Sequence, residues 1–249
     1  MYVTAPLWIL LLAFLLTSCC PLLAQRRHQN PSRKSLLDGN RRPFDSRYHK
    51  LESGGKLTAY AITIPAHEST LIATHPHDYV LISLSRSNLE AVGSANRYPL
   101  QMEPEELQVI QGGWAHCLKN LGGAPASLIE IDVDSKIDPE HARCGLLASP
   151  CTDGRFGKTD EGVYTISTLF ETATLKVTKV ELGPGGSLPQ HRHWGSPLLI
   201  PLTPIHLNDA AEEQVDKVVG EVHSYPAGIT HELRNASPEN VRLLEVEVK

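Results

Sequence analysis

The sequence has few aromatic residues and no apolar run long enough to cross a membrane. Phe, Trp and Tyr make up 6% of its 249 residues, while Val, Leu, Ile and Thr recur in short runs. Such runs favour many modest strands over a bundle of long helices. Residues 7–16 form an uncharged apolar run of about ten residues, and a membrane span needs roughly twenty. With 41% hydrophobic and 20% charged residues, an all-β globular protein of one large or two small domains is expected.

A basic surface of the kind that binds nucleic acid is also missing. The net charge is −5 at pH 7, and residues 25–50 carry eight Lys or Arg against two Asp. Because residues 1–24 have no charged side chain, the local charge of +6 on residues 25–50 leaves −11 for residues 51–249. Nucleic-acid binding needs a basic face that neutralises phosphates. The acidic body therefore argues against that class of partner.

The N-terminal residues have the features of a targeting signal. The apolar run 7–16 has the length of a signal-peptide h-region, so residues 1–24 are predicted to be a signal segment and the chain to be exported. The sequence LTSC that ends at Cys19 resembles a bacterial lipobox, in which a lipidated Cys19 anchors the protein to the membrane. Ala24 instead resembles an ordinary signal-peptidase site, which predicts a periplasmic or secreted protein. Both cleavage positions stay open.

Residues 25–50 show little apolar periodicity and are predicted to form a basic disordered tether. A basic segment beneath an acidic body could lie along an anionic lipid surface. The alternative is a solvated linker that contacts no membrane.

Three histidines of the C-terminal half have spacings suited to metal binding. His191 and His193 are two residues apart, so in a strand they point to the same face. Residues 226–228, Pro-Ala-Gly, predict a turn that delivers His231 to the same place. Three imidazoles can then converge on one ion, and imidazole suits Fe, Ni, Cu, Zn and to some degree Mn.

The same region resembles the two signature motifs of the cupin family. The pattern G-x5-H-x-H is met by Gly185, His191 and His193, and the pattern G-x5-P-x-G-x2-H-x3-N is met by Gly220, Pro226, Gly228, His231 and Asn235. The resemblance implies a small jelly-roll barrel whose interior holds a metal ion and a ligand. Asn235 is expected to cap a turn or strand rather than to bind the metal.

One residue of the family pattern is absent. A Glu ligand falls four or five residues after the second His, and here Pro197 and Leu198 occupy those positions. The motifs therefore predict a three-His variant of the site. Three neutral imidazoles leave the charge of a divalent ion uncompensated, which favours an anionic substrate.

The N-terminal half repeats this pattern. His116, Asn120 and Glu130 precede His231, Asn235 and Glu245 by 115 residues, and the pair His75 and His77 precedes His191 and His193 by 116. In the first half, Glu105 and Gln111 replace the motif Gly and Pro, and Ser69 stands where the first motif's Gly is expected. This repetition predicts two tandem cupin barrels, residues 51–134 and 161–249. His75, His77 and His116 form either a second metal site or a vestige of one.

Residues 135–160 contain Pro and Gly among scattered charges and are predicted to connect the barrels. In an oxidising compartment, Cys144 and Cys151 could form a disulfide within this connection. Cys117 is expected to be a small buried residue. The strand-like runs of the sequence are residues 57–64, 78–84, 127–133, 163–170, 175–182, 198–202, 217–222 and 241–248.

The sequence thus predicts an exported, metal-binding bicupin. The resemblance to three-His cupin dioxygenases implies an Fe(II)-dependent oxidoreductase acting on a small anionic chelating substrate, with Mn, Ni, Cu or Zn as alternative metals. No separate acid or base can be assigned. A non-catalytic cupin that binds a sugar or an acid and a metal-dependent isomerase or lyase remain as alternatives. A homodimer paired through edge strands is also expected from the resemblance.

Overall fold

The computed structural model describes residues 45–158 and 162–249. The predicted signal segment, Cys19 and most of the predicted tether lie outside these residues. Within them, β-strands dominate, and the only helix is the short 3-10 helix η1 (Pro139–His141). No helix in this part of the chain has the length and apolarity that crossing a membrane requires. The predicted all-β fold class is confirmed.

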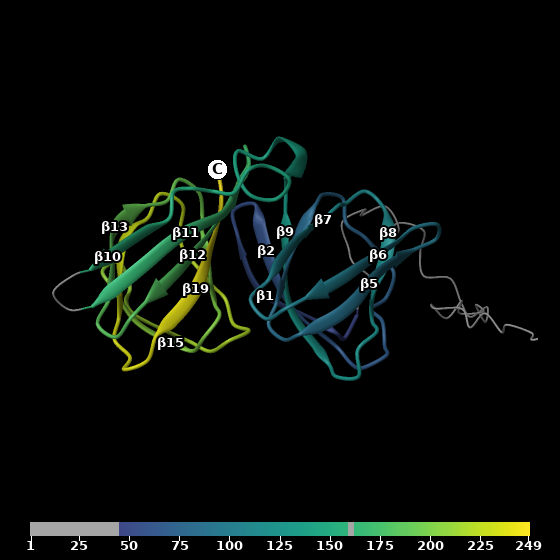
Figure 1. Ribbon diagram of the computed structural model, residues 1–249, viewed down its shortest axis with the longest axis horizontal. Coiled ribbons are helices and arrows are strands. Elements are labelled where there is room, and N and C mark those ends of the chain that lie inside the picture. The colour runs from purple at the N-terminus through teal and green to yellow at the C-terminus, as the bar shows by residue number, and fades with distance from the viewer. Residues whose placement is uncertain (1–44, 159–161) are drawn as a thin grey trace, which may run out of the picture. The chain divides into compact units, whose positions relative to one another are not determined.

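Strands β1 to β9 form the first barrel from two antiparallel sheets (Figure 1). The larger sheet contains, in spatial order, β1 (Tyr48–Gly54), β2 (Leu57–Ile64), β9 (Ala126–Val133), β4 (Tyr79–Ser83) and β7 (Leu107–Ile110). The smaller sheet contains, in order, β3 (Ala73–Thr74), β8 (Ala115–Asn120), β5 (Ser87–Gly93) and β6 (Arg97–Met102). The first strand thus begins three residues before the start predicted for this barrel.

The second barrel has the same strand order. Its larger sheet contains β10 (Arg155–Lys158), β11 (Val163–Glu171), β12 (Leu175–Leu182), β19 (Val241–Val248), β14 (Leu198–Pro201) and β17 (His223–Ser224). Its smaller sheet contains β13 (Ser187–Arg192), β18 (Thr230–Asn235), β15 (Ile205–Asp209) and β16 (Glu213–Lys217). Apart from the added edge strand β10, each strand has a counterpart in the first barrel. The duplication predicted from the sequence is therefore visible in the sheet topology.

The predicted strands agree with the structure to within one residue at either end, except one. Residues 217–222 were expected to form a strand, but β16 ends at Lys217. Gly220 has a φ of 94°, which lies outside the β region and interrupts extended backbone. That prediction is wrong, because only Val218 and Val219 lie between the end of β16 and this left-handed glycine, and two residues are too few to continue the pairing.

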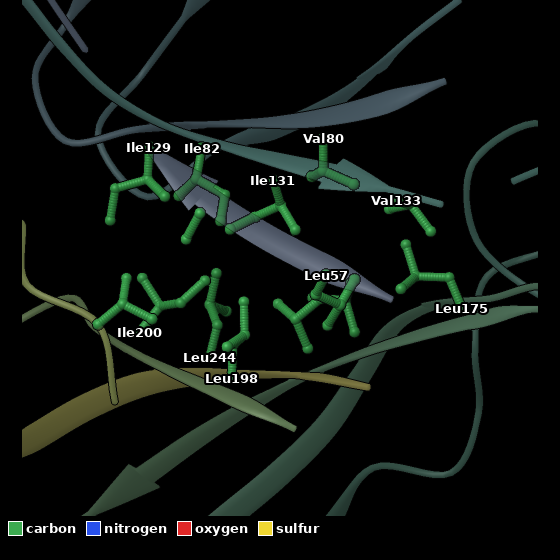
Figure 2. Close-up of a cluster of buried hydrophobic side chains, with 14 of the residues drawn as sticks. Leu57, Val80, Ile82, Ile129, Ile131, Val133, Leu175, Leu198, Ile200 and Leu244 are labelled. Carbon is green, nitrogen blue, oxygen red and sulfur yellow. The ribbon is translucent and has the colours of Figure 1, made fainter. Parts of the chain in front are cut away.

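The central strands of the larger sheet are buried on both faces in each barrel. In β4, Tyr79 and Leu81 belong to the apolar cluster inside the first barrel, whereas the alternating Val80 and Ile82 belong to a cluster shared with the second barrel. Figure 2 shows this shared cluster, in which side chains of the first barrel face Leu198, Ile200, Leu244 and others of the second. A separate cluster fills the second barrel. The two larger sheets therefore pack against each other through their outer faces.

Strand register corrects the alignment of the two halves. His191 pairs with His231 between β13 and β18, whereas Ala73 pairs with His116 between β3 and β8. Ala73 is therefore the counterpart of His191, and His75, two residues later, is the counterpart of His193. The offset of the first motif is thus 118 residues, as between β2 and β12, and not the predicted 116.

Backbone conformation supports the same register. Gly185 and Gly220 have φ values of 70° and 94°, and their counterparts His67 and Glu105 also have positive φ, 63° and 70°. His67, and not Ser69 as predicted, thus occupies the position of the first motif glycine. These positions require a left-handed conformation that glycine adopts without strain.

Glu105 joins the two barrels despite this strain. Its carboxylate lies 3.1 Å from Lys179 Nζ and 2.7 Å from Arg242 Nη2, both in the second barrel. The side chain therefore gives the first barrel an ionic contact that a glycine could not make.

The connection between the barrels contains the predicted disulfide. Cys144 and Cys151 are bonded, with their Cα atoms 4.8 Å apart, and Cys117 is buried as expected. Leu147 lies within the disulfide loop and is 77% exposed. Strand β10, at the end of the predicted connection, pairs with β11.

Candidate metal centre

Four side chains of the second barrel converge on one point. His191 lies in β13, His193 directly follows this strand, His231 lies in β18 and Glu245 lies in β19. The Nε2 atom of His231 is 3.1 Å from Nε2 of His191 and 3.2 Å from Nε2 of His193. Glu245 Oε1 is 3.4 Å from His191 Nε2 and 3.8 Å from His193 Nε2. The three histidines predicted from the motifs are thus brought together, and a carboxylate joins them.

Each imidazole is oriented by a hydrogen bond at its other nitrogen. His191 Nδ1 lies 3.0 Å from the carbonyl oxygen of Pro189, and His231 Nδ1 lies 3.1 Å from Asp209 Oδ2. His193 Nδ1 lies 3.2 Å from Glu247 Oε2. These partners accept hydrogen bonds, so each neutral ring carries its proton on Nδ1 and presents the Nε2 lone pair to the centre.

The donor set fits a divalent transition metal. Nitrogen lone pairs that face one another at these distances repel unless a metal ion or a shared proton lies between them. Two imidazole nitrogens bound at about 2.1 Å to neighbouring positions of one ion lie roughly 3 Å apart, close to the observed spacing. Glu245 Oε1 is buried and makes no hydrogen bond of good geometry among the described residues. An ion at this point would bind that oxygen.

Burial and charge distinguish the walls of the centre from its opening. The side chains of His231 and Glu245 are buried, whereas that of His191 is 26% exposed. Burial opposes ionisation of Glu245, but its proximity to His191 and the other two imidazoles outweighs burial and lowers its pKa. The centre is therefore reached by solvent on the side of His191.

Glu245 is the ligand that the motifs did not identify. Pro197 and Leu198 occupy the positions at which the resemblance placed a Glu ligand, and the carboxylate comes instead from a strand after the second motif. The available signal was the repeat itself, since Glu130 and Glu245 are related by the same 115 residues as His116 and His231. With Glu245 in the set, one of the two positive charges of a divalent ion is compensated. The uncompensated charge expected for a site of three neutral histidines is therefore reduced by one.

Glu247 and Asp209 accept hydrogen bonds from the Nδ1 atoms of His193 and His231, on the side of each ring that faces away from the centre. Glu247 accepts hydrogen bonds from the backbone N–H groups of Trp194 and Gly195 as well as contacting His193. Burial opposes ionisation of Glu247, but the bond to His193 and these N–H groups lower its pKa. The carboxylate thus fixes both the imidazole and the loop that follows it.

The corresponding histidines of the first barrel are arranged differently. His75 groups with Glu130 and Asp132, at 3.8 and 3.5 Å from its Nδ1 atom. His116 Nε2 is hydrogen-bonded to the Tyr79 hydroxyl at 2.7 Å. The side chain of His77 is 43% exposed and lies 3.5 Å from Asp134. The structure therefore does not gather His75, His77 and His116 around one point.

Two replacements explain this difference. Ala73 stands at the position of His191, so one imidazole is absent from the first centre. Tyr79 pairs with Asp132, and the register of the second barrel continues to Pro197 opposite Glu247. Tyr79 is therefore the counterpart of Pro197. Its hydroxyl lies on the nitrogen of His116 that would bind a metal. The Trp114 ring stacks on the His116 ring, 4.1 Å away, and completes a packed interior.

No family model and no curated protein matches this sequence. Solved structures with a similar fold include a cupin 2 conserved barrel domain protein from Leptotrichia buccalis (17% identity, 81% of this chain, 88% of the other, TM-score 0.53). A second is a point mutant of oxalate decarboxylase from Bacillus subtilis (12%, 82%, 76%, 0.56). A third is salicylate 1,2-dioxygenase from Pseudaminobacter salicylatoxidans (11%, 81%, 76%, 0.57). At these identities the similarity concerns the fold, and the chain has the cupin fold with two barrels.

Proposed function

We propose that this chain is an exported, metal-dependent enzyme of the dioxygenase type, which uses Fe(II) and acts on a small anionic chelating substrate. The observation that carries the proposal is the convergence of three Nε2 atoms and one buried carboxylate oxygen in the second barrel. A site that served only to stabilise the barrel would have no need of three lone pairs facing one another.

The ligand number leaves room for substrate. An ion that prefers six ligands keeps open positions when His191, His193, His231 and Glu245 bind it, and when bound it would supply Lewis acidity and O2 binding. The partly exposed His191 marks the side from which a small molecule reaches the centre. One positive charge remains after Glu245 is counted, which favours a singly charged chelating anion.

Two other functions remain as alternatives. A metal-dependent lyase or isomerase is supported by Glu245, which adds a carboxylate to the three imidazoles that could hold the ion. A non-catalytic protein that captures a sugar or an acid would use the same group of side chains without turnover. Fold alone does not choose among these functions.

Location and assembly follow from other residues. We propose that the protein works in an oxidising compartment outside the cytoplasm, with the disulfide of Cys144 and Cys151 as supporting feature. Anchoring through a lipidated Cys19 and pairing of two copies through edge strands belong to the same proposal.

Oxygen consumption tests the proposal most directly. The mature protein is loaded anaerobically with Fe(II), its metal content is measured, and O2 uptake is followed with a panel of small 2-hydroxy, enediol and catechol-type acids. We expect uptake with at least one of them and none for His231→Ala. Turnover of a substrate without O2 would favour the lyase or isomerase. Tight ligand binding without turnover would leave the binding protein, and failure to retain any metal would refute the enzyme.

A further inference from the structure

Asp209 is a buried carboxylate that neither motif contains. It ends strand β15, and its side chain is fully buried. Its Oδ2 atom accepts a hydrogen bond from the Tyr225 hydroxyl at 2.6 Å and lies 3.1 Å from His231 Nδ1, and its Oδ1 atom accepts the N–H of Ala211 at 2.8 Å. Both oxygens of the carboxylate are thus directed at named donors.

This arrangement decides which nitrogen of His231 carries the proton. An ionised carboxylate only accepts hydrogen bonds, so the contact with His231 requires a proton on Nδ1. The Nε2 atom is then a bare lone pair aimed at His191 and His193. A carboxylate behind a metal-binding histidine fixes its ring orientation and makes it a stronger ligand.

The first barrel has apolar residues in place of this pair. Leu89 pairs with Asn120 in the first barrel, as Leu207 pairs with Asn235 in the second. Two residues further along each strand, Ala91 is therefore the counterpart of Asp209. Tyr79, the counterpart of Pro197, pairs with Ile110, and the N–H of Tyr225 donates to the carbonyl oxygen of Pro197. Ile110 is therefore the counterpart of Tyr225. In the first barrel His116 Nδ1 faces the carbonyl oxygen of Trp114, 3.1 Å away.

We propose that Asp209 is a positioning residue that holds His231 as the Nδ1–H tautomer and that metal binding in the second barrel depends on this carboxylate, with the Tyr225 hydroxyl as its second donor. The metal part of this inference rests on the proposed function, whereas the tautomer is a property of the protein without metal. Tyr225 shares the Oδ2 atom with His231, so its hydroxyl moderates the negative charge that the imidazole receives. Its ring also packs edge-on against the His231 ring, with centroids 4.7 Å apart, and keeps water from the pair.

The test combines two readouts. The nitrogen chemical shifts of the His231 ring are measured by NMR in the metal-free protein, and Co(II) affinity is measured against a competing chelator. We expect wild type to show the Nδ1–H tautomer, and Asp209→Ala to show a mixture of tautomers and a Co(II) affinity reduced roughly 10- to 100-fold. Tyr225→Phe, which keeps the ring but removes the shared donor, should keep the tautomer and bind Co(II) as tightly as wild type or more tightly.

The controls separate positioning from general destabilisation. Asp78→Ala removes a buried carboxylate of the first barrel that accepts the N–H of Gly112, and it should change neither readout. If Asp209→Ala does not fold, Asp209→Asn takes its place, because its amide cannot satisfy all three donors. A variant at Asp209 that keeps the Nδ1–H tautomer and binds Co(II) within about twofold of wild type overturns the proposal. Wild type that shows the tautomer but binds no Co(II) or Fe(II) would refute the proposed function and the metal half of this inference, leaving the tautomer assignment standing.

Discussion

The two barrels share a scaffold and differ at its centre. In the second barrel His191, His193, His231 and Glu245 converge. In the first, counterparts of three of these remain, but Ala73 replaces one histidine and the Tyr79 hydroxyl lies on His116 Nε2. The same strands in the same order thus support either an open ligand set or a packed aromatic interior. The strand order is therefore kept where the set of candidate ligands is incomplete.

The retained asparagines show what the scaffold does require. Asn120 donates to the carbonyl oxygens of Ile64, Pro65 and Ala124, and Asn235 donates to the equivalent carbonyl oxygens of Leu182, Gly183 and Glu239. Each side chain also accepts a backbone N–H two residues later. These bonds tie a turn to a neighbouring strand in both barrels, which confirms the capping role expected for Asn235.

Removal of one histidine from each barrel should give the largest difference between the two barrels. His231→Ala is expected to abolish metal binding, because it removes a central ligand, whereas His116→Ala should leave the metal content at one ion per chain. Elemental analysis of both variants after Fe(II) or Co(II) loading measures this difference. Two ions in wild type, with one lost in each variant, would contradict the closed state of the first centre.

Substitution of two neighbouring leucines in β19 should distinguish the stability of the contact between the barrels from the stability of the second barrel's interior. Leu244 belongs to the shared cluster and Leu243 to the interior of the second barrel, and each change to Ala should cost about 2–5 kcal/mol of unfolding free energy. Denaturation followed by Trp114 fluorescence, with Trp8 and Trp194 both changed to Phe, reports on the first barrel. Only Leu244→Ala is expected to shift that transition. Equal shifts in both variants would mean that the chain unfolds as one unit.

A site could be restored in the first barrel by reversing two replacements. Ala73→His supplies the missing imidazole opposite His116, and Tyr79→Phe removes the hydroxyl from its Nε2 atom. The double variant should bind a second, weaker Co(II) ion, detected by titration, while Tyr79→Phe alone should not. A folded double variant that still binds one ion would show that the surrounding packing, and not these two residues, closes the centre.

The smallest effect is expected at the left-handed positions. His67 is exposed and has positive φ, so His67→Gly should relieve backbone strain and raise stability by up to about 1 kcal/mol. Glu105→Gly relieves the same strain but loses the contacts with Lys179 and Arg242, worth at most about 1 kcal/mol each at a surface. Urea midpoints compare the two. A larger gain for Glu105→Gly would indicate that the ionic contacts add nothing.

Much of the fold and part of the site were predictable from residue spacing. The glycines, histidines and asparagines of the motifs occupy turns and strand positions that tolerate few other residues, so they identified the barrels and three ligands. Glu245 was not identified, because a ligand from a distant strand has no fixed spacing to the motif. The signal for it was the equivalent Glu130 in the first half.

The alignment of His75 failed for a related reason. The letters H-x-H occur in both halves, and matching them paired His75 with His191. Hydrogen-bond register pairs Ala73 with His116 instead, which moves every first-barrel residue of that motif by two positions. Strand pairing is a property of the folded sheet, and a short motif that recurs by coincidence cannot reveal it.

The disulfide loop has a consequence for how the protein withstands proteases. Leu147 protrudes between Cys144 and Cys151, at the junction of the barrels. Exposed loops with few contacts are preferred sites of cleavage. A cut beside Leu147 would separate the chain into its two barrels, yet the disulfide and the shared apolar cluster would hold the pieces together. A nicked molecule should therefore keep its metal centre intact and fall apart only when reduced and denatured.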